Sequence, residues 1–231
     1  MLLSLLFSFP ASAPVVRLLL YTHIAAGSLA LLVGLVPMLG RKGGPGHVRA
    51  GRVYVYAMLV VAATAVLLCL LQPLVVRRLL LAGVALLSFY LSFSGWRAAW
   101  RHSATLPAGD VVLAGLTALV GLAMVGVGIG LQAVLFGFFG VLLCLFGSLD
   151  TWRGLRPPAS VPGAWLQRHI VRMGGSYVSA STAFVIVNLG YFLPADTPSW
   201  VGLLGWFAPA VIGRLLIVAA VRRYRPASRL G

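Results

Sequence analysis

Long apolar runs, separated by short polar or basic segments, organise the chain from its first residues to its last. An α-helix needs about 20 mostly apolar residues to cross the hydrocarbon core of a bilayer. Seven runs meet or approach this length, and they cover residues 15–39, 53–72, 79–99, 110–131, 133–150, 168–193 and 200–221. The pattern predicts an all-α integral membrane protein with seven transmembrane helices, forming one domain over residues 1–231.

The segments between the runs carry loop signals. "GRKGGPGHVRAGR" (40–52) is predicted to be a basic, glycine-rich loop, and "TWRGLRPPASVPGAW" (151–165) is the longest loop. Gln132 marks a very tight turn. Residues 1–13, "MLLSLLFSFPASA", are apolar and end like a signal-peptidase site, but they lack a basic first region. We expect this segment to be a retained apolar stretch or a weak signal-like one.

Composition supports a membrane protein. The chain is 61% hydrophobic and only 9% charged, whereas a soluble domain carries about 25% charged residues. The net charge of +15 could suggest nucleic-acid binding, but the basic residues stand in short loops between apolar runs, where they set topology and meet anionic lipid. We therefore expect membrane lipids as partners and no nucleic acid.

The distribution of basic residues predicts the orientation. With seven spans, one side of the membrane collects fourteen of them and the other side collects three. The larger group is Arg41, Lys42, Arg49, Arg52, Arg97, Arg101, Arg153, Arg156, Arg168, Arg172, Arg222, Arg223, Arg225 and Arg229, and the smaller is Arg17, Arg77 and Arg78. Cytoplasmic loops carry the excess of Lys and Arg, so the N-terminus is expected outside and the C-terminus in the cytoplasm.

Glycine is abundant in the fourth and fifth runs, as "GVGIG" (126–130) and "GFFG" (137–140). Small residues let transmembrane helices approach closely. No strand precedes these glycines, so a dinucleotide-binding loop is excluded, and we expect helix packing.

Three of the four histidines fall at the predicted cytoplasmic side. His47, His102 and His169 share this depth, and three imidazoles near a carboxylate are a donor set for zinc or iron. Alternatively, His47 and His169 could ligate one haem b, with Arg49, Arg52 or Arg172 meeting its propionates. The competing interpretation is that these histidines only cap helix ends and meet lipid headgroups.

His23 lies inside the first helix. It precedes Gly40 by seventeen residues, which is about 25 Å of depth at 1.5 Å per residue. His23 and His169 therefore cannot ligate the same metal ion unless the first helix is broken. An ionisable side chain at this depth usually faces the interior or a wet cavity, and a neutral histidine bonded to a neighbouring helix is the alternative.

The helix predicted over 168–193 carries a polar stripe. His169, Met173, Tyr177 and Ser181 follow a step of four, and Asn188 comes about two turns later. We expect this face to point into the bundle. Three of these residues, together with His23, form a candidate polar site towards the outer side: His23, Asn188, Tyr177 and Ser181. Interhelical hydrogen bonding, worth about 0.6 kcal/mol per contact, is the structural alternative.

Two further residues bear on function. Arg214 stands in the last predicted helix and is expected to snorkel or to pair with Asp150. Seven helices also suggest a rhodopsin, but a retinal Schiff base needs a lysine in the last helix, and Lys42 is the only lysine.

Three blocks resemble a family of uncharacterised bacterial multi-pass membrane proteins, a domain of unknown function. The blocks are "HIAAGSLALLVG" (23–34), "GHVRAGRVYVYAM" (46–58) and "HIVRMGGSYVSASTAFVIVN" (169–188), with the patterns HxxxG, GHxxxGRxYxxxM and HxxxMxxSYxxxxTAF. The resemblance implies that His23, His47 and His169 are the family's histidines, with Met173 and Tyr177 in its third block. Where members often have tryptophan before the methionine, this chain has Arg172. His102 lies outside the blocks.

These observations favour a protein of the bacterial inner membrane that binds haem b or a transition metal and serves redox chemistry or electron transfer. The candidate cofactor residues are His47, His169, Arg52 and Met173, and the metal alternative is His47, His102 and His169. A quinone or another small apolar substrate is an expected partner. A small-molecule or proton-coupled transporter, and a non-catalytic subunit of a larger complex or oligomer, remain alternatives. Whether the protein is an enzyme is left open.

Overall fold

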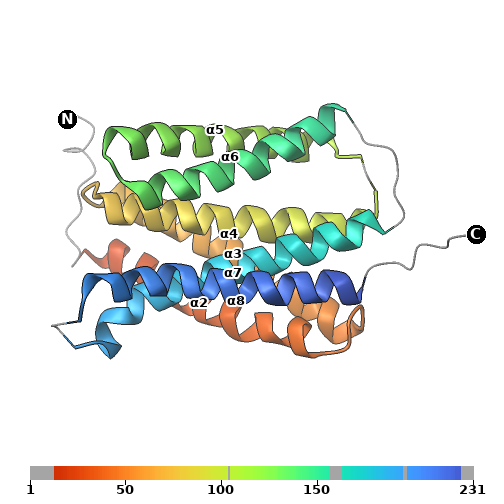
Figure 1. Cartoon of the computed structure of the whole chain (residues 1–231), viewed down its shortest axis with the longest axis horizontal. Helices are drawn as coiled ribbons and strands as arrows, with labels where there is room; N and C mark the ends of the chain where they lie inside the picture. Colours follow the sequence, from red (N-terminus) through yellow and green to blue (C-terminus); the bar gives the residue numbers. More distant parts are fainter. Residues whose placement is uncertain (1–12, 104, 157–162, 195–196, 225–231) are drawn as a thin grey trace, which may run out of the picture.

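The computed structural model describes residues 13–103, 105–156, 163–194 and 197–224. Within these ranges it contains seven α-helices and no strand (Figure 1). The helices are α2 (Pro14–Leu39), α3 (Pro45–Leu71), α4 (Val76–Arg101), α5 (Ala108–Gly130), α6 (Val134–Leu155), α7 (Ala164–Phe192) and α8 (Ser199–Arg223). All seven are long and apolar enough to cross a membrane, which confirms the predicted all-α, multi-pass architecture. Residues 1–12 lie outside the described ranges.

The largest boundary difference is at α3. This helix begins at Pro45, whereas the apolar run begins at residue 53, so most of the expected loop over 40–52 is helical. Proline is favoured at the first helical position because its ring fixes a helical φ and the N–H it lacks would have no helical partner there. Hydropathy marks only the part of a helix that contacts the lipid tails. The first residues of α3 are helical but polar, so the apolar run begins later than the helix does. This extension places His47 in the first turn of α3.

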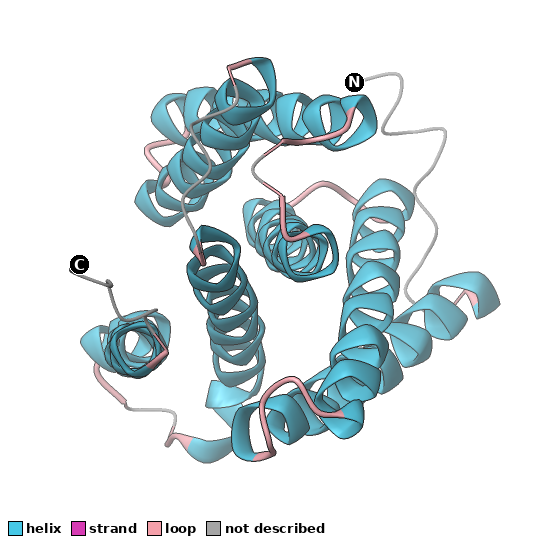
Figure 2. Ribbon diagram, turned by 90° about the vertical axis from the view of Figure 1, so that its right-hand side faces the viewer, coloured by secondary structure: helices cyan, strands magenta, loops and turns pink. Residues whose placement is uncertain are grey.

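The helices run side by side as a bundle. Figure 1 shows the α5–α6 pair along one side, α2 and α8 along the opposite side, and α4 between them. Neighbouring pairs are α2 with α3, α3 with α4, α4 with α7, and α7 with α8. The α5–α6 pair packs on the rest of the bundle mainly through the contact of α6 with α4. Seen along the bundle, the helix next to the described C-terminal end lies at the edge (Figure 2). That helix, α8, has α7 as its main neighbour.

Small residues join α5 to α6. A Cβ on Gly128 would lie 2.7 Å from the backbone nitrogen of Gly137, and a Cβ on Gly121 would collide with the backbone of Cys144. In contrast, a Cβ on Gly126 or Gly130 would meet nothing within 4 Å. The packing interpretation of "GVGIG" is therefore confirmed for its central glycine.

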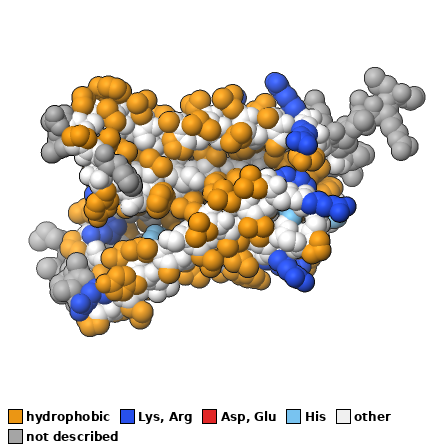
Figure 3. Space-filling model, turned by 90° about the horizontal axis from the view of Figure 1, so that it is seen from below, with side chains coloured by type: hydrophobic (Ala, Val, Ile, Leu, Met, Phe, Trp, Pro, Cys, Tyr) orange, Lys and Arg blue, Asp and Glu red, His pale blue; other side chains and the backbone are white. Residues whose placement is uncertain are grey.

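The surface matches a lipid environment. Apolar side chains cover the middle of the molecule, and Lys and Arg side chains lie near its ends (Figure 3). Two apolar clusters form the interior. One joins α4, α5 and α6 around Val84 and Leu143, and the other joins α2, α3 and α4 around Tyr54 and Met58, with Met173 and Tyr177 of α7 packed against it.

Candidate functional site

His47 and His169 meet at one end of the bundle. Their ring centroids lie 6.0 Å apart, with an angle of 56° between the ring planes. His47 comes from the first turn of α3 and His169 from the second turn of α7. Both residues are half-buried. The structure thus brings together the two histidines that the sequence suggested as a haem pair.

Each of the two rings is oriented by a backbone carbonyl. Nδ1 of His47 lies 3.2 Å from the carbonyl oxygen of Pro37, and Nδ1 of His169 lies 3.0 Å from that of Gly95. A carbonyl oxygen can only accept, so Nδ1 is the protonated nitrogen in both rings. In the neutral ring the lone pair then sits on Nε2. Histidines that bind metals are oriented in this way, through a hydrogen bond from the second ring nitrogen.

The end of α2 supplies the acceptor for His47. The last carbonyls of a helix have no partner within the helix. The backbone N–H of Gly40 donates to Val36, while Nζ of Lys42 donates to Pro37, at 2.8 Å, and to Met38. Burial and the nearby charge of Arg223 lower the pKa of Lys42. The carbonyl of Pro37 therefore holds both the lysine and the imidazole, and it anchors α2 to α3.

Gly95 supplies the acceptor for His169 and also allows α7 to approach α4. A Cβ at this position would lie 2.9 Å from Cβ of Arg172 and 3.0 Å from the backbone nitrogen of Met173. The carbonyl oxygen of Gly95 has two lone pairs, so it can accept from His169 as well as from its own helix. A glycine is needed here for the contact between the two helices.

The other predicted cofactor residues lie near the pair without joining it. Met173 packs against Gly95 and the interior cluster around Tyr54. Arg52 is exposed on α3, five residues after His47. His102 is exposed at the end of α4, and its ring centroid lies 4.1 Å from that of Trp165. Among the described residues, no three His, Cys, Asp or Glu side chains gather as a metal-binding group, so a three-histidine site is not assembled.

The four residues of the expected outer polar site do not converge. Nδ1 of His23 lies 2.9 Å from Oγ1 of Thr64 on α3. The hydroxyl of Tyr177 donates to the carbonyl of Leu31, and Nδ2 of Asn188 donates to the carbonyl of Phe184 within its own helix. Ser181 is half-buried. His23, Tyr177 and Asn188 therefore each bond to a different residue. The partners of Tyr177 and Asn188 are backbone carbonyls.

A different hollow lies at the end of the bundle opposite the histidine pair. It has a volume of about 530 Å³ and is lined mainly by apolar side chains of α7 and α8, and Arg77 of α4 also lines it. Leu189 lines it, twenty residues after His169 on α7, which corresponds to about 30 Å along the helix. The hollow and the histidine pair are therefore separate sites.

The polar side of α7 faces the bundle interior, as the sequence predicted. The fully buried polar residues stand beside the expected stripe, at Arg172, Ser176, Ser179 and Thr182. Ser176 donates to the carbonyl of Ser88 at 2.6 Å, so its oxygen accepts from the hydroxyl of Tyr54 at 2.8 Å. Ser88 in turn donates to Ser179 at 2.8 Å. These bonds tie α7 to α3 and α4.

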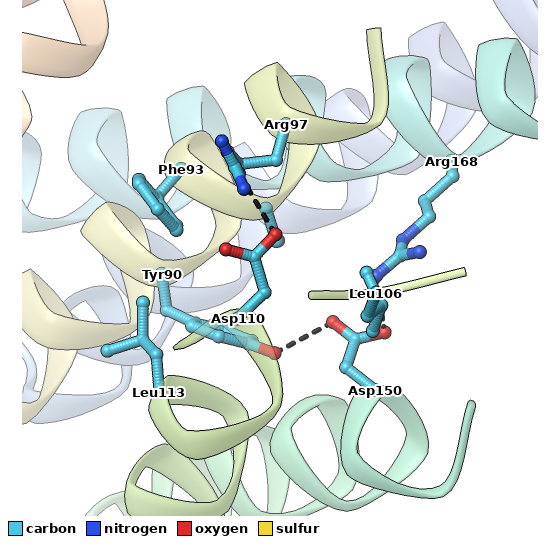
Figure 4. Close-up of a pocket in the computed structure, with 9 residues that line it drawn as sticks. Tyr90, Phe93, Arg97, Leu106, Asp110, Leu113, Asp150 and Arg168 are labelled. Carbon is cyan, nitrogen blue, oxygen red and sulfur yellow. Dashed lines mark hydrogen bonds and ion pairs between the residues drawn. The ribbon is translucent and has the colours of Figure 1, made fainter. Parts of the chain in front are cut away.

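A buried carboxylate lies at the centre of a charge cluster between α4, α6 and α7. Asp150 is 1% exposed. Its oxygens lie 2.9 Å from Nη2 of Arg168 and 2.9 Å from Nη2 of Arg172, and the hydroxyl of Tyr90 donates to it at 2.7 Å. Figure 4 shows Tyr90 and Arg168 converging on the carboxylate, with the Arg97–Asp110 pair beside them at 2.9 Å. Arg172 also lies over the ring of Phe146, 4.5 Å from its centroid.

This cluster has a structural role. The cavity that it lines has a volume of about 10 Å³, room for about one water molecule, so no organic substrate fits there. The prediction that Arg214 pairs with Asp150 is wrong, because Arg214 is exposed on α8. The missed signal was the pair Arg168 and Arg172, four residues apart on α7 and therefore on one face.

Comparison with protein-family models, with curated proteins and with solved structures finds no match to this chain.

Proposed function

We propose that the protein binds haem b or a transition-metal ion between His47 and His169 and serves electron transfer in the bacterial inner membrane. One observation carries the proposal: both imidazoles donate from Nδ1 to backbone carbonyls, with ring centroids 6.0 Å apart. With Nδ1 protonated, both histidines keep the Nε2 lone pair that a metal ligand needs. Histidines that only capped helix ends would not require this tautomer.

The separation of the two rings supports a metal held between them. Metal–nitrogen bonds are about 2 Å long, so two imidazoles on opposite sides of one ion have centroids about 6 Å apart. Gly51 stands four residues after His47, on the same face of α3, and a Cβ there would meet nothing within 4 Å. The side of α3 that carries His47 is thus open beside the ring.

Each residue has a defined part in this proposal. His47 and His169 would hold the metal through Nε2, and the carbonyls of Pro37 and Gly95 keep each ring in the tautomer that presents Nε2. Arg52 is exposed at the same end and would pair with the acidic groups of a haem. A haem held there would supply one-electron chemistry, and the residues of this chain would bind it, orient it and bury it.

The location in the membrane is also part of the proposal. The excess of Arg and Lys at the end that holds the pair would place it on the cytoplasmic side, with the N-terminus outside. The apolar hollow at the other end suits a lipid-soluble partner such as a quinone. Such a molecule would occupy a separate site, about 30 Å away along α7.

The transporter alternative is less well supported. A polar pathway along α7 needs hydroxyls that can meet water or substrate. Ser176, Ser179 and Thr182 are instead buried, and each bonds to a neighbouring serine or to a carbonyl. The polar side of α7 therefore fits helix–helix bonding better than a pathway.

An optical spectrum of the purified protein, oxidised and then dithionite-reduced, tests the proposal together with metal analysis of the same sample. A Soret band that shifts on reduction, or one metal ion per chain, is the expected result. His47→Ala and His169→Ala should each remove it, whereas His102→Ala should not, because that ring lies against Trp165. A colourless, metal-free protein that binds neither added haemin nor added Fe²⁺ and Zn²⁺ would refute the proposal.

A further inference from the structure

Arg214 stands well inside the membrane-spanning helix α8. It lies nine residues before Arg223, where the helix ends, and fourteen residues after Trp200. At 1.5 Å per residue, these separations are about 13 Å and 21 Å along the helix. The side chain is exposed on the outside of the bundle. A charged side chain at this depth is costly in lipid and almost always has a partner.

Within the part of the chain that the structure describes, Arg214 has no ion pair and no hydrogen bond. The two described carboxylates are committed elsewhere: Asp110 pairs with Arg97, and Asp150 pairs with Arg153, Arg168 and Arg172. The third aspartate, Asp196, precedes α8 in the sequence and lies outside the described residues.

Snorkelling is an unfavourable solution for this side chain. The C-terminal end of α8 is the nearer end, yet helical side chains lean towards the N-terminus of their helix. The Cα–Cβ bond of Arg214 therefore points away from the nearer headgroups, so the side chain would have to turn back along the helix to reach them. A basic residue near an N-terminal helix end would not have this difficulty.

The surroundings of Arg214 form an open helix face. Gly213 faces α7, because a Cβ there would collide with Val178. The next residue points about 100° away from that contact. Three apolar residues share this face: Phe207 seven residues before Arg214, Val211 three residues before it and Val218 four residues after it. All three are exposed, although the ring of Phe207 also lies 6.4 Å from that of Phe138 on α6. These four residues form one stripe, which we name the Arg214 stripe.

We propose that the Arg214 stripe is the docking surface for a transmembrane helix of a different membrane protein, one that carries Asp or Glu at the depth of Arg214. The apolar residues of the stripe would pack on that helix, and the carboxylate would pair with the guanidinium. A second copy of this chain is a poor occupant. A twofold contact uses the same patch of both copies, so it would place two Arg214 side chains in one interface at the same depth and supply no carboxylate from either stripe.

A defined probe tests the proposal. The full-length protein, labelled with a donor dye at its C-terminus, is placed in phosphatidylcholine vesicles with an acceptor-labelled polyleucine transmembrane peptide that carries one Asp nine residues from its end. Energy transfer should show association about tenfold tighter than with the peptide that carries Leu at that position. Arg214→Leu should remove the difference. Arg214→Asp paired with a peptide that carries Arg should restore it.

A matched control moves the charge around the helix at nearly constant depth. Leu215 is 66% exposed, so the double variant Arg214→Leu with Leu215→Arg keeps an exposed arginine but takes it off the stripe. Its association with the Asp peptide should fall by several-fold. Equal association of the wild type with the Asp and Leu peptides would overturn the proposal and assign Arg214 to lipid phosphates. Undiminished association of the moved-charge variant would also overturn it, because pairing would then be independent of the stripe.

Discussion

His47 and His169 lie on different helices, α3 and α7, and each is oriented by a carbonyl of yet another helix, from Pro37 on α2 and from Gly95 on α4. Four helices must therefore be packed correctly before the two Nε2 atoms can face a common ligand. The pair is a consequence of the packing, so substitutions that alter helix approach should alter binding at the proposed cofactor site without changing His47 or His169.

Gly95→Ala is the sharpest such substitution. The added methyl group would lie 3.0 Å from the backbone nitrogen of Met173, and backbone cannot move aside as a flexible side chain can. We expect a loss of about 1–3 kcal/mol in the free energy of unfolding, measured by titration with SDS in mixed micelles. We also expect the cofactor content per chain to fall to less than half.

The control is Gly126→Ala on α5, where a Cβ meets nothing within 4 Å. This substitution should leave both measurements within error of the wild type or stabilise slightly, because alanine favours a helix more than glycine does. If the two variants behaved alike, the close approach of α4 and α7 at Gly95 would not be what holds His169.

The sequence predicted some of these features well. The spans follow from a single demand, that a helix in lipid be long and apolar, and hydropathy measures this directly. His47 and His169 could be assigned to one end of the bundle because topology alone gives depth. Depth does not give the direction of a side chain around its helix. Depth alone therefore also admits His102, whose ring lies against Trp165 in the structure.

The charge cluster and the outer site show what pattern alone leaves open. Asp150 pairs with Arg172 because α6 and α7 both lie against α4 there, and helix neighbours cannot be derived from hydropathy. The sequence predicts that Tyr177 and Asn188 line a polar site, whereas in the structure each donates a hydrogen bond to a backbone carbonyl. A polar group in lipid takes the partner within reach.

Asp150→Asn should be strongly destabilising. The substitution keeps the size of the side chain but leaves Arg172, which is 3% exposed, without its counter-charge. Removing one partner of a buried pair costs about 3–5 kcal/mol, and titration with SDS should detect the loss. The double variant Asp150→Asn with Arg172→Gln should recover part of the lost free energy of unfolding. It removes the guanidinium of Arg172, which is the most buried of the charges that Asp150→Asn leaves unpaired.

The comparison variant for that experiment is Asp110→Asn. Its pair with Arg97 is less deeply buried, with 14% of the Asp110 side chain and 17% of the Arg97 side chain exposed, so losing it should cost less than the roughly 3–5 kcal/mol of a fully buried pair. A loss at Asp110 as large as the one at Asp150 would contradict the view that burial sets the cost.

Tyr54→Phe should have a small effect. The hydroxyl of Tyr54 donates to Ser176, but Ser176 keeps its own bond to the carbonyl of Ser88 when the phenol is removed. Hydrogen bonds between transmembrane helices contribute about 0.6 kcal/mol on average, so the free energy of unfolding should fall by about 1 kcal/mol or less. The cofactor content should be unchanged. A loss above 3 kcal/mol would show that the network is strongly cooperative.

His23→Leu separates the histidine of α2 from the proposed cofactor site. His23 stands seventeen residues before Gly40, about 25 Å from the end of α2 that anchors His47, so it cannot bind the same metal ion as His47. Its partner Thr64 keeps a hydrogen bond to the carbonyl of Val60 at 2.7 Å after the imidazole is removed, and no buried group is left unsatisfied. Haem or metal content per chain and the reduced-minus-oxidised spectrum should therefore match the wild type. If His23→Leu lost the cofactor while His169→Ala retained it, the ligands would have to be sought on α2 and α3 instead, and the site between α3 and α7 would be refuted.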